Sequence, residues 1–143
     1  MRWIDLPPVW LLAAIAVAWA WRWPDAWDGL FWSGGACLVL AAGLVIGAVL
    51  EFTRARTTII PREAPSALIT SGIFRFSRNP IYLADLLVLF GVAVMWGSVP
   101  GLVLVPVLAW VLQTRFIRGE EERLAAAFGL EFEAYRSGTR RWI

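Results

Sequence analysis

Four apolar runs constrain this chain more than any other feature of its sequence. They cover about residues 8–21, 29–50, 80–96 and 99–117. A helix of about 20 apolar residues crosses a hydrocarbon core of about 30 Å. We therefore expect four transmembrane helices. The first run is short and resembles the core of a signal peptide, but it lacks a clear small-residue cleavage site before a soluble mature domain, so we interpret it as a span.

The composition supports the membrane class. Hydrophobic residues make up 59% of the 143 residues and charged residues only 17%. Soluble domains usually have about 45–50% apolar and about 25% charged residues. The ten tryptophans fit the same class, because Trp concentrates where a bilayer meets water. We expect one all-α integral membrane domain over residues 1–143.

The arginines predict how the chain is oriented. All thirteen basic residues are arginine, and most lie either in residues 51–79 or after residue 117. The positive-inside rule places both segments in the cytoplasm, together with both termini. We expect the inner membrane of a bacterium as the location. Nucleic acid is excluded as a partner, since the arginines lie at the ends of apolar runs and form no separate soluble face.

Several kinds of chemistry are excluded by missing residues. The chain has no histidine and a single cysteine, Cys37, inside an apolar run. A catalytic zinc site and a disulfide within the chain are therefore not expected. The sequence also lacks a glycine-rich phosphate loop and a nucleophile elbow. We expect no metal.

The start of the third run carries unusual polar residues, in the stretch FRFSRNPIYLAD. Arg78, Tyr82 and Asp85 are spaced four and three residues apart, which places them on one helix face beside Asn79 and Pro80. An ionisable group near the hydrocarbon usually faces a bundle interior or a cavity. Alternatively, Arg78 snorkels, Tyr82 belongs to an aromatic belt and Asp85 pairs with a nearby arginine. We favour a functional site.

The tail after the fourth run predicts an amphipathic helix over about Gly119–Phe128, ended by Gly129. Its acidic residues Glu120 and Glu121 could bind an amine or paired ribose hydroxyls near the membrane. Acidic residues are also favoured in any first helical turn by the helix dipole, and by charge alone this second interpretation is the better one. The apolar residues that follow could lie on the membrane or cap the bundle.

Two further features concern packing. Gly43 and Gly47 form a small-xxx-small pattern that lets membrane helices approach closely, and this face could support a homo-oligomer. Gln113 in the fourth run either forms a hydrogen bond to another helix or lines a pocket, and the sequence does not distinguish between these two roles.

In their order, these pieces resemble the isoprenylcysteine carboxyl methyltransferase and phospholipid methyltransferase family, membrane enzymes that use S-adenosylmethionine. The resemblance covers about residues 57–143. The family pattern Arg-His-Pro-x-Tyr-x-Gly, Glu-Glu, Phe-Gly, Tyr, Arg-Trp corresponds to Arg78-Asn79-Pro80, Tyr82, Ala84, Glu120-Glu121, Phe128-Gly129, Tyr135 and Arg141-Trp142. Asn79 replaces the usual histidine, and Ala84 replaces glycine.

The resemblance implies a cofactor site between the cytoplasmic ends of the last two spans, under the tail helix. Glu120 or Glu121 then receives the ammonium or ribose hydroxyls of S-adenosylmethionine. Arg78 and Asn79 bond its carboxylate. Tyr82, after Pro80, packs against the cofactor or bonds to it.

The expected activity is methyl transfer to a lipophilic acceptor that enters from the bilayer. Arg75, Arg115 and Arg118 are candidates to neutralise an anionic acceptor. A prenylcysteine-type carboxylate needs no base, whereas a lipid amine or small thiol does, and Asp85 is the candidate for that role. The missing histidine slightly favours an acceptor that needs no strong base.

Two other classes compete with the enzyme. The first is a non-catalytic membrane scaffold or a family member that has lost activity. The second is a small transporter, which is disfavoured because the charges gather on one side of the membrane instead of crossing its midplane.

Overall fold

The computed structural model describes residues 6–23, 29–56 and 67–143, and in these ranges the only regular structure is helical. The longer helices are α1 (Pro7–Ala20), α2 (Phe31–Ala55), α3 (Pro80–Met95), α4 (Val99–Leu112), α5 (Arg118–Phe128) and α6 (Leu130–Gly138). A short 3-10 turn, η2 (Gly72–Arg75), precedes α3, and a π-helical segment, η3 (Gln113–Ile117), joins α4 to α5. The expectation of an all-helical chain is confirmed for the described residues.

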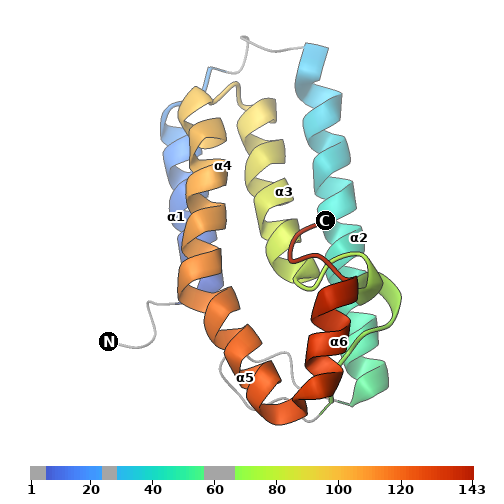
Figure 1. The fold of residues 1–143 in the computed structure, drawn as a ribbon. Helices are drawn as coiled ribbons and strands as arrows, with labels where there is room; N and C mark the ends of the chain where they lie inside the picture. Colours follow the sequence, from blue (N-terminus) through green and yellow to red (C-terminus); the bar gives the residue numbers. More distant parts are fainter. Residues whose placement is uncertain (1–5, 24–28, 57–66) are drawn as a thin grey trace.

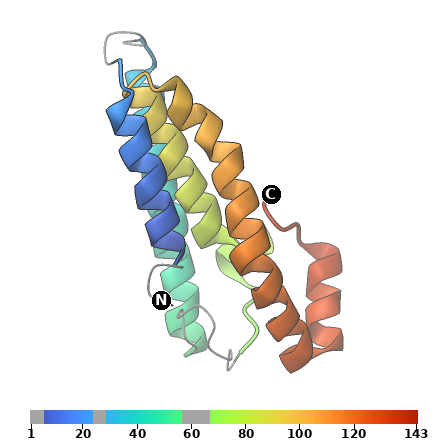
Figure 2. The ribbon, with the colours of Figure 1, turned by 90° about the vertical axis from the view of Figure 1, so that its left-hand side faces the viewer.

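Helices α1 to α4 lie side by side along their lengths (Figures 1 and 2). At one end of this bundle α1 and α3 begin and α2 and α4 end, and α5 and α6 lie at that same end (Figure 1). The polar segments on either side of α3 and α4 therefore meet at one end of the bundle.

Two helices are long and apolar enough to cross a membrane: α2 and the uninterrupted helix Val99–Phe128. Helices α1 and α3 are apolar but shorter. In the most apolar part of α2 only 17% of the residues are buried, whereas a core helix of a soluble protein would bury most of them. The low burial of α2 fits a membrane protein, and two of the four expected spans meet the length criterion among the described residues.

Glycines allow α2 and α3 to approach closely. A Cβ atom at Gly34 would lie 2.6 Å from the carbonyl oxygen of Gly91, and one at Gly91 would lie 2.8 Å from the carbonyl oxygen of Gly34. By contrast, a Cβ at Gly43 would meet nothing within 4 Å, and one at Gly47 would meet only Ile73 at 3.6 Å or more. Gly34 and Gly91 therefore set the spacing of these helices, and the predicted oligomer face at Gly43 and Gly47 stays a prediction.

A tight turn connects α3 to α4. Gly97 has φ of 64°, a backbone conformation that glycine adopts without strain. Ser98 is fully buried, and its hydroxyl accepts a hydrogen bond from the Gly101 amide at 3.2 Å. This N-cap, with Pro100 in the first turn, explains why α4 starts at once after the turn.

The core joins α1, α3, α4 and the π-helical segment. Its buried members are Ala14, Ala18, Tyr82, Leu89, Leu108, Leu112, Phe116 and Ile117. The end of this core nearest α5 contains Tyr82, which is why a polar residue of the third apolar run is held in a fixed position at the polar end of the bundle.

The tail helix differs from the expectation at its start. It does not begin at Gly119, because α4 continues through η3 into α5 without a break, and Ile117, the residue before α5, already has helical φ and ψ of −59° and −44°. The predicted end is confirmed: Gly129 has φ of 51° and ends α5. A second helix, α6, follows and buries Phe132.

Candidate functional site

The candidate site lies where the start of α3, the α4–η3–α5 helix and the C-terminal residues meet. Pro80 occupies the first turn of α3 and Asn79 is its N-cap. A proline is favoured there because the first amides of a helix have no partner within it. The helix start therefore fixes the backbone of Arg78, Asn79 and Tyr82 relative to the core.

Arg78 is the central residue of the site. Its side chain is only 10% exposed, and its Nη2 atom lies 3.4 Å from Oε1 of Glu121. Its Nε and Nη1 atoms are buried and have no hydrogen-bond partner among the described residues. Burial lowers the pKa of this guanidinium, and the nearby Glu121 carboxylate opposes that effect. Two donors of a buried cation are thus left without an acceptor.

Glu121 is held by a second arginine. Arg141 donates from Nε to Oε1 at 3.0 Å and from Nη2 to Oε2 at 2.6 Å, a two-bond fork. This hydrogen bonding raises the pKa of Arg141. Two guanidinium groups therefore share one carboxylate, and the fork assigns both of its oxygens to Arg141.

The C-terminal residues after α6, here called the C-terminal strap (residues 139–143), are fastened to the start of α3. The Arg78 amide donates to the carbonyl oxygen of Arg140 at 3.0 Å. The side chains of Asn79 and Ser77 donate to the carbonyl oxygen of Arg141, at 3.0 Å and 3.3 Å.

A last bond joins the strap to the π-helical segment. Trp142 donates from Nε1 to Oε1 of Gln113 at 3.4 Å. The strap therefore bridges the two walls of the site. Gln113 bonds to this non-helical strap and not to another helix, so neither of its two predicted roles is tested by this contact.

Tyr82 and Glu120 form the other polar contact across the walls. The buried Tyr82 hydroxyl donates to Oε1 of Glu120 at 2.7 Å, and its ring lies 6.5 Å from that of Phe116. The predicted cofactor residues of α3 and α5 are thus brought together by the structure.

The alternative explanation for Glu120 and Glu121 loses its basis. A helix dipole favours carboxylates at a helix start, where amides lack partners within the helix. Because α4, η3 and α5 form one continuous helix, no free helix start lies beside these residues. Their side-chain contacts with Tyr82 and Arg141 account for their positions instead.

The residues predicted to act on the acceptor lie outside these contacts. Arg75, Arg115 and Arg118 are exposed, and the Arg115 guanidinium lies 5.3 Å from the ring centre of Trp10. Asp85 is partly buried. The ion pair with a neighbouring arginine, considered for Asp85 from the sequence, is not present among the described residues. Their roles stay predictions.

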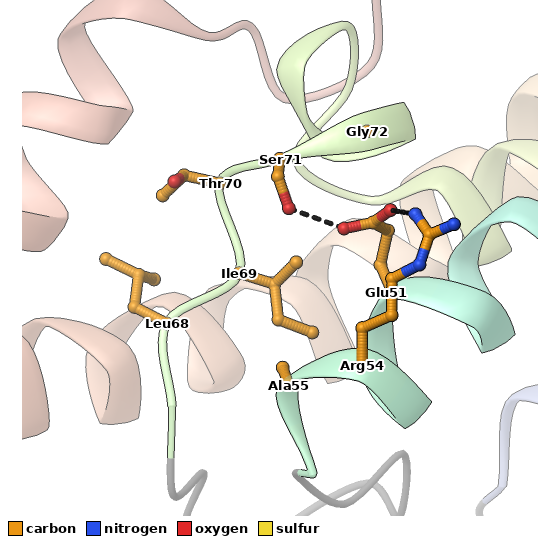
Figure 3. A pocket seen from close by; sticks show the side chains of 8 residues that line it. All are labelled: Glu51, Arg54, Ala55, Leu68, Ile69, Thr70, Ser71 and Gly72. Carbon is orange, nitrogen blue, oxygen red and sulfur yellow. Dashed lines mark hydrogen bonds and ion pairs between the residues drawn. The ribbon is translucent and has the colours of Figure 1, made fainter.

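A hollow that was not predicted lies between the end of α2 and the segment that leads into η2 (Figure 3). Its volume is about 490 Å³, and it is lined by residues that include Glu51 and Arg54 of α2 and Leu68 to Gly72. Glu51 accepts hydrogen bonds from Ser71 and Arg54. A Cβ at Gly72 would lie 2.5 Å from Oε1 of Glu51. These contacts fasten the end of α2 to the segment before α3.

Arg141 and Ser77 are site residues that the sequence reasoning did not assign. Ser77 contacts the Arg141 carbonyl oxygen 64 positions away, and the Arg141 side chain contacts Glu121 20 positions away; helical spacing reveals neither contact. The signal present was the Arg-Trp pair at the end of the family pattern. Tyr135, also in that pattern, donates from its hydroxyl to the Phe74 carbonyl oxygen at 2.7 Å and so packs α6 onto η2.

Comparison with known proteins gives one match. A family model described as phospholipid methyltransferase matches residues 30–131. Neither the curated proteins nor the solved structures contain a detectable match. The matched range includes α2 to α5 and ends before the strap. Among the described residues, no group of three or more His, Cys, Asp or Glu is placed to hold a metal ion.

Proposed function

Because the chain belongs to the phospholipid methyltransferase family, we propose that it transfers a methyl group from S-adenosylmethionine to a lipophilic acceptor. The acceptor is a prenylcysteine-type carboxylate, a lipid amine or a small thiol. Among the described residues, α2 and the helix Val99–Phe128 are long enough to span a membrane. We extend this to four spans by including α1 and α3. The arginine-rich end, with α5 and α6, then faces the cytoplasm of a bacterial cell.

The two unpartnered donors of Arg78 are the observation that carries the proposal. A buried donor without an acceptor costs about 1–3 kcal/mol, and more when it is charged. The carboxylate of S-adenosylmethionine supplies the missing acceptors, since a guanidinium and a carboxylate match in shape and charge. The residues present therefore fit the amino-acid end of the cofactor.

The remaining side chains of the site accept hydrogen bonds or pack. Glu120 presents a carboxylate oxygen to an ammonium group or to ribose hydroxyls, while Glu121, whose two oxygens Arg141 engages, places negative charge beside the ammonium. Tyr82 supports Glu120 through its 2.7 Å bond and offers its ring as a packing surface. Asn79 contributes by holding the strap through the Arg141 carbonyl oxygen, so Arg78 is the main donor to the carboxylate.

S-adenosylmethionine, when bound, supplies an electrophilic methyl group. The chain then has to orient the acceptor and exclude water, and orientation supplies much of the rate enhancement for such a displacement. Arg75, Arg115 and Arg118 neutralise an acceptor that carries negative charge. Asp85 removes a proton where the acceptor is an amine or thiol.

Isothermal titration of the detergent-solubilised protein with S-adenosylmethionine tests the proposal. Replacing Arg78 with lysine keeps the positive charge but removes the paired N–H donors of the guanidinium group, which a carboxylate would bind. We expect affinity to fall about 10- to 100-fold, equivalent to about 1.5–3 kcal/mol for a charged hydrogen-bonding group. The control is Arg22→Lys, an exposed arginine that donates to the Trp19 carbonyl oxygen and should leave affinity unchanged.

A wild-type protein that does not bind S-adenosylmethionine at high micromolar concentration would refute the enzyme and favour the non-catalytic scaffold. Where binding is found, the acceptor is identified by incubation with cofactor labelled in the methyl group. Phospholipids, prenylcysteine analogues and small thiols are supplied in parallel, and the product that carries label is isolated.

A further inference from the structure

We propose that Arg141 is a positioning residue that keeps Arg78 available for the cofactor's carboxylate. The inference rests on the proposed function and assigns a role to the C-terminal strap. Arg141 acts through Glu121, by engaging the carboxylate that would otherwise satisfy Arg78.

The competition between the two arginines is visible in the distances. Arg141 engages both oxygens of Glu121, at 3.0 Å and 2.6 Å. Arg78 reaches only Oε1, through Nη2, at 3.4 Å. The shorter, paired contacts belong to Arg141, and Nε and Nη1 of Arg78 have no partner among the described residues.

Removing the Arg141 fork changes what Arg78 can do. A carboxylate next to a buried guanidinium favours a two-bond fork, because paired charged hydrogen bonds are the strongest available. Glu121 would then turn its freed oxygens toward Arg78 and occupy the donors that an incoming carboxylate requires. Arg78 would still be charged, but Glu121 would already occupy its hydrogen-bond donors.

The strap determines where the Arg141 guanidinium lies. Its own carbonyl oxygen accepts from Asn79 and Ser77, and the next residue, Trp142, bonds to Gln113. These bonds fix the backbone on both sides of the side chain. The Arg141 side chain is 29% exposed and that of Arg78 is 10% exposed, so Arg78 is the more deeply buried of the two arginines that contact Glu121.

The chain offers a matched control in the neighbouring residue. Arg140 lies on the same strap and carries the same charge, but its side chain is exposed. The strap uses the carbonyl oxygen of Arg140, which accepts from the Arg78 amide, and this bond survives a change of side chain. Arg140→Lys therefore alters the strap without altering the fork.

The test measures preference for the carboxylate by titrating each variant with S-adenosylmethionine and with decarboxylated S-adenosylmethionine. We expect the wild type and Arg140→Lys to prefer the carboxylated compound by tenfold or more. In Arg141→Lys, which keeps the charge but not the fork, the preference should fall to about twofold or less. Affinity for the decarboxylated compound should change less than twofold.

Both ligands are titrated into one preparation, so loss of folded protein changes both stoichiometries and leaves the ratio of Kd values unchanged. An unchanged ratio in Arg141→Lys, or an equal loss of affinity for both compounds, overturns the role of Arg141. If the wild type binds neither compound, the proposed function is overturned as well. This outcome is seen in the wild type alone, whereas failure of the role of Arg141 is seen only by comparing the variant with the wild type.

Discussion

Replacing Gly34 with alanine is expected to separate α2 from α3. The new Cβ would lie 2.5 Å from Cγ of Met95 and 2.6 Å from the carbonyl oxygen of Gly91. The methionine side chain can move away, but the backbone oxygen cannot. A relaxed carbon–oxygen contact is about 3.3 Å or longer, so the two helices must move apart by roughly 0.7 Å at this point.

The cost of that movement can be compared with known overpacking. Adding a methyl group to a tightly packed interior costs about 1–3 kcal/mol. For a chain of about this length each kcal/mol lowers the unfolding temperature by about 2–4 °C. We therefore expect a decrease of about 2–12 °C for Gly34→Ala, reduced by the better helix propensity of alanine, which is worth up to about 1 kcal/mol.

Gly35→Ala is the matched control, because a Cβ at Gly35 would meet nothing within 4 Å. It changes helix propensity equally and should leave the unfolding temperature unchanged or raise it. The assay is a thermal melt followed by a thiol-reactive dye, which reads the single cysteine, Cys37. A Cβ at Gly91 would lie 3.2 Å from that of Cys37, so the thiol reports on the α2–α3 contact.

An unfolding temperature for Gly34→Ala no lower than that of Gly35→Ala would refute the close contact of α2 and α3, because the control carries the same gain in helix propensity. An equal loss in Gly35→Ala would attribute the effect to the helix itself and not to the contact. Faster dye labelling of Gly34→Ala below its unfolding temperature is expected as a second sign of separation.

Two other changes test the cap of α4 and the packing of α6. Ser98→Ala removes the acceptor for the Gly101 amide and should cost about 1 kcal/mol in the same melt; an unchanged melt would contradict the cap. Burial raises the pKa of Tyr135 to about 12, above its usual value of about 10. The folded state therefore keeps its proton longer than the unfolded state, and this contribution to stability is complete below pH ~10 and lost as pH rises toward ~12. Tyr135→Phe should flatten that part of a stability–pH curve, and an identical slope in both proteins would refute it.

The ends of the helices were predictable because they depend on neighbouring residues. Pro80 begins α3, Gly97 and Ser98 form the turn before α4, and Gly129 ends α5. Each of these signals acts within one or two turns of the chain, through a missing amide, a positive φ or a cap. Local chemistry of this kind is readable without knowledge of the other helices.

Contacts between distant residues were not predictable in the same way. The spacing of Gly43 and Gly47 indicates a face suited to helix contact, yet Gly34 and Gly91 make the close approach within the chain. The spacing predicts Arg78 and Tyr82 on one helix face, but Arg78 lies before α3, which starts at Pro80 with Asn79 as its N-cap. The sequence could not show that Arg141 would take the Glu121 carboxylate, because that fork depends on how the strap returns to α3.

The π-helical turn at Gln113–Ile117 has a consequence for how the acidic pair is aimed. A turn closed by a bond to the fifth residue contains one residue more than an α-helical turn, and each residue of an α-helix advances the side-chain direction by about 100°. The turn therefore rotates the side chains of α5 about the helix axis relative to those of α4. Deleting one residue from it would keep the helix intact and rotate Glu120 away from Tyr82. The direction in which Glu120 and Glu121 point thus depends on the number of residues in this turn, and not only on which residues form the site.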